Sequence, residues 1–129
     1  VGICLGMQLL ADASTELQLT AGLGLVPGQV QALEPAHTRW HIGWNAMEVV
    51  GSDPLFAPSD GVSLYFNHSF VFQAPPEYTV GVSRVRLGGA AFPVAVRRNN
   101  LVGLQFHPEK SQQAGRALLQ RVIRGVCDA

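Results

Sequence analysis

The 129-residue sequence predicts a single α/β domain, spanning residues 1–129, in which a strand-rich region precedes a C-terminal helix. Three observations predict this fold class: a strand–turn–helix pattern at the start, a strand-rich middle with a hairpin signal, and an amphipathic helix at the end. No internal repeat, low-complexity tract or long linker divides the chain. The length is sufficient for one hydrophobic core.

The first expected elements are the end of a buried strand at Val1–Cys4 and a helix at Gly6–Ala13. The strand is apolar, and apolar residues recur at roughly helical spacing in the second segment. In Gly22–Leu33 the apolar residues are broken by glycine and proline, which predicts a loop leading into a short strand.

The middle of the chain predicts several strands, partly antiparallel. The polar triplet Asn67–Ser69 interrupts one of them, and the proline-containing segment Asp53–Gly61 is expected to be a surface connection. Turns are expected at Gly88–Gly89 and at Arg98–Asn100, where asparagine tolerates the left-handed backbone of a hairpin. The strands are expected at the end of Trp40–Val50 and over Ser63–Phe72, Val80–Leu87, Phe92–Arg97 and Leu101–Phe106.

The C-terminal segment predicts a helix with Ser111 as its N-cap. Its apolar face comprises Leu118, Leu119, Val122, Ile123 and Val126.

Composition limits the classes of function. Nine Lys and Arg residues balance nine Asp and Glu residues, so a nucleic-acid surface is not expected. A hydrophobic content of 47% argues against disorder. No apolar run reaches the roughly 18 to 20 residues of a membrane span, which predicts a soluble, cytoplasmic protein without membrane contact. Cys4 and Cys127 lie far apart and outside any zinc-binding pattern, so reduced thiols are expected.

The stretch GICLGMQLL places Cys4 at the expected turn from strand to helix. Backbone N–H groups and a helix N-terminus at such a turn would lower the thiol pKa, and Gly2 and Gly6 would relieve crowding. The N–H of Leu5 would face a developing oxyanion. A buried, inert cysteine is an equally good interpretation of this motif alone.

The segment QFHPE supplies a base for a reactive cysteine. His107 and Glu109 are two residues apart on an expected extended segment, so the carboxylate can orient the imidazole ring. A solvated strand end is the alternative for this pair. Together with the cysteine turn, the pair favours a Cys4–His107–Glu109 triad.

The paired motifs GICLGMQ and QFHPEKS resemble the class I glutamine amidotransferases, whose signature is G-x-C-x-G-x-Q followed by H-P-E near the C-terminus. The resemblance covers essentially the whole chain. Three further pieces resemble the glutaminase subunits of imidazole glycerol phosphate synthase: Gly43–Asn45 preceded by His41, YFNHSF, and Lys110–Ser111. The resemblance implies a flavodoxin-like, three-layer fold with a central mixed sheet, truncated at its N-terminus.

The resemblance also implies the chemistry. Cys4 would attack the side-chain amide of glutamine, His107 would transfer protons, and Glu109 would hold His107; no metal or other cofactor is required. Gly6 and Gln8 match positions that contact glutamine.

The backbone around His68, Ser69 and Phe70 matches the segment that receives the α-amino and carboxylate ends of the substrate. Ammonia would pass to a (β/α)8-barrel synthase in histidine biosynthesis. The residues that match the partner-facing stretches are His41, Trp44, Asn45 and Lys110.

Some positions depart from the family pattern, namely Trp40, Asn67 and Phe70. The chain also begins at Val1, almost at the cysteine turn, so a missing N-terminal portion is expected. Such a portion would supply a second oxyanion donor, and weak or no activity is expected without it. Two alternatives stay open: a glutaminase serving anthranilate, purine, GMP or pyridoxal phosphate synthesis, and a non-catalytic remnant that keeps a partner interface.

Overall fold

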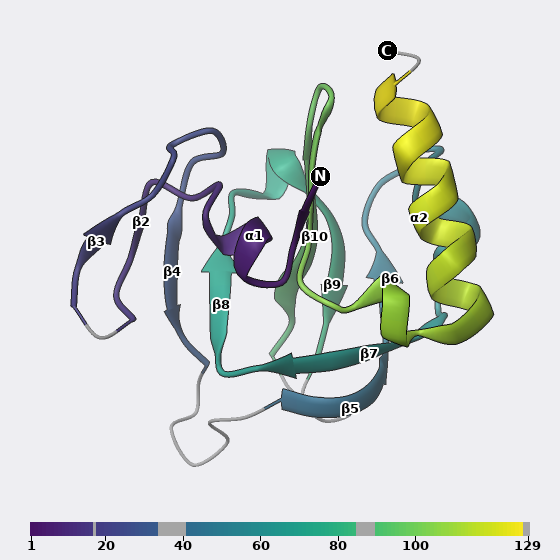
Figure 1. The fold of residues 1–129 in the computed structure, drawn as a ribbon, viewed down its shortest axis with the longest axis horizontal. Helices are drawn as coiled ribbons and strands as arrows, with labels where there is room; N and C mark the ends of the chain where they lie inside the picture. The colour runs from purple at the N-terminus through teal and green to yellow at the C-terminus, as the bar shows by residue number, and fades with distance from the viewer. Residues whose placement is uncertain (17, 34–40, 85–89, 128–129) are drawn as a thin grey trace.

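The computed structural model describes residues 1–16, 18–33, 41–84 and 90–127, whose strands form three sheets (Figure 1). The five-stranded sheet has the order β1 (Gly2–Ile3), β11 (Leu101–Leu104), β10 (Phe92–Arg98), β9 (Thr79–Ser83) and β6 (Glu48–Val49). The four-stranded sheet has the order β3 (Thr20–Ala21), β2 (Ala13–Ser14), β4 (Gln29–Ala32) and β8 (Phe70–Gln73). The third sheet pairs β5 (His41–Ala46) with β7 (Ser63–His68).

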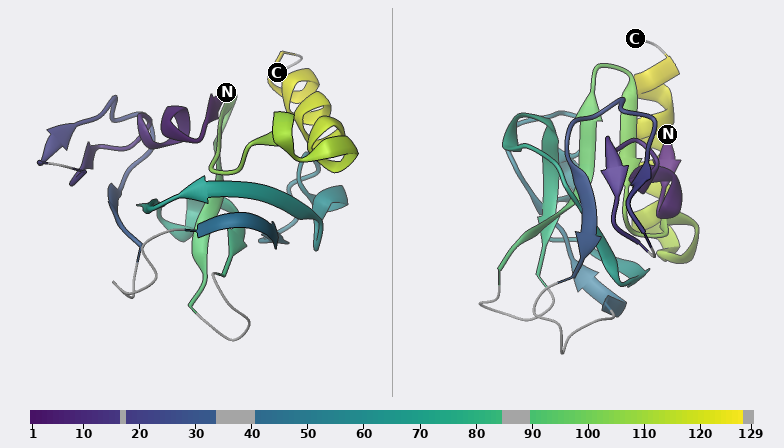
Figure 2. Two further views of the ribbon diagram at one scale, coloured as in Figure 1. Left: turned by 60° about the horizontal axis from the view of Figure 1, so that its bottom comes forward. Right: turned by 90° about the vertical axis from the view of Figure 1, so that its left-hand side faces the viewer.

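Two α-helices and three short 3₁₀ helices accompany these strands in the described part of the chain. They are α1 (Leu5–Gln8), α2 (Gln112–Cys127), η1 (Ala57–Ser59), η2 (Pro76–Tyr78) and η3 (Pro108–Lys110). The helix α2 and the β2–β3 pair lie at opposite ends of the molecule, with α1 between them (Figures 1 and 2).

The five-stranded sheet is mixed, which confirms the predicted α/β class. Strand β1 runs parallel to β11, whereas β10 is antiparallel to both β11 and β9. The predicted hairpin joins β10 to β11, and Asn99 has a φ of 55° in its turn. This left-handed backbone is one that asparagine tolerates better than most residues.

The predicted strand over Ser63–Phe72 is divided in two, because the chain changes sheets within its polar triplet. Strand β7 pairs with β5 and β8 pairs with β4, with Ser69 between them. In Figure 1 the β5–β7 pair runs across the direction of β8, β9 and β10. The polar residues therefore mark a corner between two sheets.

The first helix is shorter than predicted, since α1 ends at Gln8 and not at Ala13. The carbonyl oxygens of Leu9, Leu10 and Ala11 accept hydrogen bonds from N–H groups of residues 23–26. In addition, the N–H groups of Leu10 and Ala11 donate only three residues back, to Met7 and Gln8, and the Asp12 N–H, which a longer helix would pair with Gln8, donates to the Gly28 carbonyl. Tertiary pairing therefore overrides the local helical pattern. The expected turn at Gly88–Gly89 and Trp40 lie outside the described residues.

The predicted C-terminal helix is present, with two corrections. Leu118 and Val122 are buried in the core, but Ile123 is 46% exposed. The Ser111 hydroxyl accepts a hydrogen bond from the Tyr65 N–H at 2.9 Å and donates to the His107 carbonyl at 2.7 Å. Ser111 therefore joins the QFHPE segment to β7, and among the described residues its side chain makes no hydrogen bond to the first turn of α2.

Two clusters of buried side chains form the core. The larger lies among the five-stranded sheet, β7 and α2. The smaller packs Met7 and Leu10, from α1 and the residue stretch after it, against Val30 of β4 and Phe72 of β8. This second cluster fixes α1 on the sheets.

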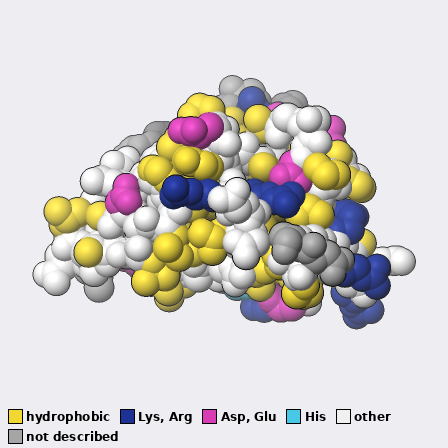
Figure 3. All heavy atoms as spheres, turned by 90° about the horizontal axis from the view of Figure 1, so that it is seen from above, with side chains coloured by type: hydrophobic (Ala, Val, Ile, Leu, Met, Phe, Trp, Pro, Cys, Tyr) yellow, Lys and Arg dark blue, Asp and Glu magenta, His cyan; other side chains and the backbone are white. Residues whose placement is uncertain are grey.

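The surface carries both signs of charge among exposed hydrophobic side chains (Figure 3). No helix of the described residues is long and apolar enough to cross a membrane. Within the same residues, no three His, Cys, Asp or Glu side chains gather in a way that could hold a metal ion.

Candidate active site

Cys4 occupies a strained turn between β1 and α1, with φ 54° and ψ −109°. A non-glycine residue in this region is rare and has an energetic cost of about 1–3 kcal/mol, so the surrounding structure must hold it there. A Cβ atom at Gly2 would lie 2.5 Å from the Gly6 carbonyl oxygen, so the turn requires glycine at position 2. At Gly6 a Cβ atom would meet no described atom within 4 Å, so the turn itself does not require glycine there.

The parallel pairing of β1 with β11 brings the two motifs together. The Cys4 N–H donates to the Leu104 carbonyl at 2.7 Å, directly where β11 ends. Parallel neighbours present their carboxyl ends at one edge of a sheet, which is where open α/β sheets bind ligands. The segment that carries His107 therefore leaves the sheet beside Cys4.

His107 and Glu109 face one another as predicted, with Nδ1 of the ring 2.8 Å from Oε1 of the carboxylate. Glu109 belongs to η3, so a 3₁₀ turn, and not an extended strand, brings the two groups together. The backbone N–H of His107 donates to the backbone carbonyl of Tyr65 at 2.9 Å, which fixes the segment on β7. If Glu109 accepts the Nδ1 proton, the Nε2 atom of the ring is the nitrogen that can act as a base.

The expected low pKa of the Cys4 thiol is wrong: burial raises it above the usual value. Hydrogen bonds from the Leu5 N–H and from Gln105 lower the pKa, but by less than burial raises it. Since α1 has only four residues, its dipole is weak compared with that of a long helix. Cys4 therefore rests as a thiol and needs a base to react.

A cavity of about 240 Å³ opens beside Cys4. It brings together most of the predicted substrate residues, whereas Gly6, His107 and Glu109 are not among its lining residues. The lining residues are Cys4, Leu5, Gln8, Glu16, Asn67, His68, Ser69 and Phe70.

Sequence reasoning missed three residues of this region: Glu16, Asn67 as a lining residue, and Gln105. The Gln105 Nε2 atom lies 3.7 Å from Cys4 Sγ. Its place at the end of β11, beside the strand that carries Cys4, was the available signal. No feature of the sequence points to Glu16, because it reaches the cavity only through the tertiary placement of the chain after β2.

His41 and His68 form a buried pair, 5% and 4% exposed, with Nδ1 of His41 2.9 Å from Nε2 of His68. Burial lowers the pKa of both rings, to about 4 for His41. The Nδ1 atom of His68 lies 2.9 Å from the Phe70 carbonyl oxygen, which can only accept. Both rings are therefore neutral, with protons on Nδ1, and the Asn45 amide donates to Nε2 of His41 at 3.0 Å.

Residues 1–124 match the family model described as glutamine amidotransferase class-I. The chain belongs to this family. Among its curated relatives is the imidazole glycerol phosphate synthase subunit HisH of Caulobacter vibrioides, 44% identical over 127 residues that cover 95% of this chain and 59% of the relative. The proteins of the same name from Listeria monocytogenes (strain HCC23) and Bacillus cereus (strain B4264) are each 40% identical, and they cover 93% and 100% of this chain.

The chain spans 57% and 60%, respectively, of the Listeria and Bacillus relatives. Solved structures support the amidotransferase fold. A Thermoplasma acidophilum protein, described as a putative GMP synthase component, aligns with a TM-score of 0.67 and 20% identity, covering 98% of this chain and 56% of that protein. A second structure, described as a glutamine amidotransferase, aligns with a TM-score of 0.55 and 22% identity, and the alignment covers 94% of this chain and 59% of that protein.

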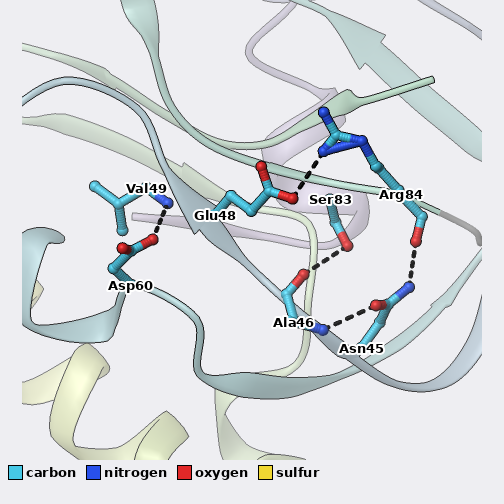
Figure 4. Close-up of polar contacts among 7 residues, drawn as sticks. All are labelled: Asn45, Ala46, Glu48, Val49, Asp60, Ser83 and Arg84. Atoms are coloured by element: carbon cyan, nitrogen blue, oxygen red, sulfur yellow. Dashed lines mark hydrogen bonds and ion pairs between the residues drawn. The ribbon is translucent and has the colours of Figure 1, made fainter. Parts of the chain in front are cut away.

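Four residues of this chain were expected to face a partner, and they differ in exposure. Trp44 is 50% exposed on β5, and the Lys110 Nζ atom lies 5.9 Å from the centre of the Tyr65 ring. His41 points inward, as described above. The Asn45 side chain makes hydrogen bonds within this chain: its Oδ1 accepts from the Ala46 N–H and its Nδ2 donates to the Arg84 carbonyl (Figure 4).

A shallow second cavity of about 440 Å³ lies beside Trp44, between β7 and the start of α2. Of the four expected residues, Trp44 is the one that lines this cavity. The partner-facing role of all four stays a prediction.

Proposed function

We propose that this chain, as one amidotransferase domain over residues 1–129, hydrolyses glutamine to glutamate and ammonia through a Cys4 thioester. The observation that carries the proposal is the strained turn of Cys4 at the sheet edge where the His107–Glu109 pair also emerges. A strained residue beside a cavity and an oriented base is the arrangement expected of an activated nucleophile.

In the first step His107 Nε2 takes the Cys4 thiol proton as Sγ attacks the amide carbon of glutamine. Because burial keeps Cys4 protonated at neutral pH, proton transfer and attack are coupled. Glu109 stabilises the imidazolium that forms. The N–H of Leu5, already directed at the sulfur region, then donates to the oxyanion.

The tetrahedral intermediate collapses when His107 returns its proton to the leaving nitrogen, which departs as ammonia. The product is a γ-glutamyl thioester on Cys4. A water molecule then gives a proton to His107 and attacks the thioester carbon. Collapse of this second intermediate releases glutamate and restores the Cys4 thiol.

The cavity offers chemically distinct groups for the two ends of glutamine. The Glu16 carboxylate suits the α-ammonium group, because opposite charges attract across a partly desolvated site. The backbone at Ser69 and Phe70 would receive the α-carboxylate. Gln8 lines the same cavity as Cys4 and would contact the substrate there. Gly6 is expected to contact glutamine from outside this lining, where an added Cβ atom would meet open space.

The likeness to HisH subunits supports a specific destination for the ammonia, namely a barrel synthase that makes imidazole glycerol phosphate. That synthase would bind the face that carries His41, Trp44, Asn45 and Lys110.

Glutamate release from glutamine tests the proposal, measured with and without the barrel synthase. Cys4→Ala should abolish release, whereas Cys127→Ala should leave it unchanged, because Cys127 is an exposed free thiol at the far end of α2. Glutamate release by the Cys4→Ala protein above the rate measured without protein would refute the proposal. Stimulation by a different synthase, but not by the barrel, would move the chain to another branch of the family.

A further inference from the structure

We propose that Gln105 is the hydrogen-bond donor that stabilises the Cys4 thiolate, and that Gln8 is the positioning residue that fixes its direction. The inference rests on the proposed function, because it assigns a role to a group that touches the nucleophile. It adds a residue to the reaction that neither the triad nor the substrate cavity includes.

The contacts form one chain from a carbonyl group to the sulfur. Gln8 Nε2 lies 3.2 Å from the Phe70 carbonyl oxygen and 3.1 Å from Gln105 Oε1. Gln105 Nε2 in turn lies 3.7 Å from Cys4 Sγ, within the range of an N–H···S hydrogen bond. Three residues, from α1, from β8 and from the position directly after β11, are therefore linked to the nucleophile.

The direction of every bond in this chain follows from the Phe70 carbonyl. A carbonyl oxygen only accepts, so the Gln8 atom that faces it must be the amide nitrogen. The second hydrogen of that nitrogen points to Gln105, so the facing Gln105 atom must be the oxygen. The remaining Gln105 atom, its NH₂ group, is then the one directed at Sγ.

The same carbonyl is held from a second side, which makes it a firm anchor. His68 Nδ1 donates to it at 2.9 Å, and His68 is itself held by His41 at 2.9 Å. Gln105 is completely buried, and its backbone N–H donates to the Val94 carbonyl at 2.8 Å. Its backbone is therefore fixed by Val94 and its amide oxygen by Gln8, so the amide nitrogen stays directed at the sulfur.

A fixed amide N–H favours the anionic form of sulfur over the neutral thiol, because a thiolate is the stronger acceptor. Burial opposes thiolate formation at Cys4. A donor that is already in place partly offsets that penalty at the moment when His107 removes the proton. A carboxylate at position 105 would act in the opposite sense, since like charges would face one another.

The test is the pH profile of Cys4 alkylation by iodoacetamide, followed by mass spectrometry in a Cys127→Ser background from about pH 6 to 11. The midpoint of the profile reports the thiol pKa, whereas a change in access alters only the plateau rate. Gln105→Met keeps the length of the side chain and removes the donor. Gln105→Glu replaces the donor by an acceptor, and Gln8→Met releases Gln105 without touching the sulfur.

We expect Gln105→Met to raise the midpoint by about 0.5–1 unit, which is roughly threefold to tenfold less thiolate at a given pH. Gln105→Glu should raise it further, and Gln8→Met should raise it less. A Gln105→Met midpoint within about 0.2 unit of the unsubstituted protein, with the near-ultraviolet circular dichroism retained, would overturn the inference. If Gln105→Met does not fold, the Gln8→Met midpoint decides in the same way.

The measurement needs no glutamine, so it separates the two proposals. Turnover that survives Cys4→Ala removes the proposed function, and the alkylation midpoints still report whether Gln105 acts on the sulfur. Loss of turnover in Cys4→Ala together with unmoved midpoints in all three variants removes only the role of Gln105.

Discussion

The substitution Gly2→Ala tests whether the turn at Cys4 depends on close backbone approach. A Cβ atom there would lie 2.5 Å from the Gly6 carbonyl oxygen, 2.6 Å from its carbonyl carbon and 2.9 Å from the Met7 nitrogen. All three neighbours are backbone atoms, so no side-chain rotation relieves the overlap. Gly2 is not among the positive-φ glycines, so the steric overlap alone accounts for the effect.

The magnitude follows from the cost of overpacking, which is typically 1–3 kcal/mol and lies near the upper end, about 3 kcal/mol, when only backbone can move. The free energy of unfolding of a domain of this length is of the order of 6–19 kcal/mol. With a urea m-value of about 2 kcal/mol/M, the unfolding midpoint should fall by about 1.5 M. Far-ultraviolet circular dichroism in urea measures this midpoint.

Gly6→Ala is the matched control, because the same added methyl group would meet no described atom within 4 Å. Its midpoint should stay unchanged or rise slightly, since alanine is favoured over glycine in a helix by roughly 0.5–1 kcal/mol. Equal urea midpoints for Gly2→Ala and Gly6→Ala would refute the reasoning. So would a Gly2→Ala protein as stable as the original.

Three further perturbations test other parts of the site. Burial lowers the pKa of His41 to about 4, so the unfolded chain binds a proton more readily than the folded protein. The free energy of unfolding should therefore fall by up to roughly 3 kcal/mol as the pH falls from about 6.5 to 4. Urea denaturation at several pH values measures this decrease, which should be smaller in His41→Gln. Glu16→Gln should raise the KM for glutamine about tenfold and change kcat little, because it removes a charge that binds an ammonium group; an unchanged KM would place the ammonium elsewhere. Gly115→Ala should lower both thermal stability and glutaminase activity, because its Cβ atom would lie 2.2 Å from the Pro108 carbonyl oxygen between His107 and Glu109; a melting temperature within about 1 °C of the original would contradict this contact.

The sequence predicted the elements that depend on local patterns, and it failed where distant segments compete. The hairpin at Asn99 and the helix α2 follow from turn chemistry and apolar periodicity, and both are present. The helix after Cys4 was predicted too long, because the Asp12 N–H, which would have donated to the Gln8 carbonyl within a longer helix, donates to the Gly28 carbonyl instead.

At the candidate site, too, local motifs could be predicted from the sequence, whereas properties that depend on distant segments could not. The triad residues could be named because each belongs to a short motif with its own chemistry. The raised pKa of the Cys4 thiol could not be foreseen, since it depends on burial by segments far away in the sequence. Gln105 belongs to the QFHPE motif, but its proposed contact with the Cys4 sulfur follows only from the parallel register that sets Ile3 opposite Leu104.

The Phe70 carbonyl explains why so many polar side chains lie behind the cavity with their hydrogen bonds satisfied. On one side a chain of donors, Asn45, His41 and His68, ends on it. On the other side Gln8 donates both to it and to Gln105, which in turn donates toward the Cys4 sulfur. Since the carbonyl can only accept, it sets the tautomer of both histidines and the orientation of both glutamines. A charged or flipped group in either chain would place two donors face to face in a buried setting, where an unsatisfied polar group costs about 1–3 kcal/mol. The neutral state of the histidine pair and the direction of the amide at the sulfur are therefore two consequences of one backbone position, the corner where the chain passes from β7 to β8.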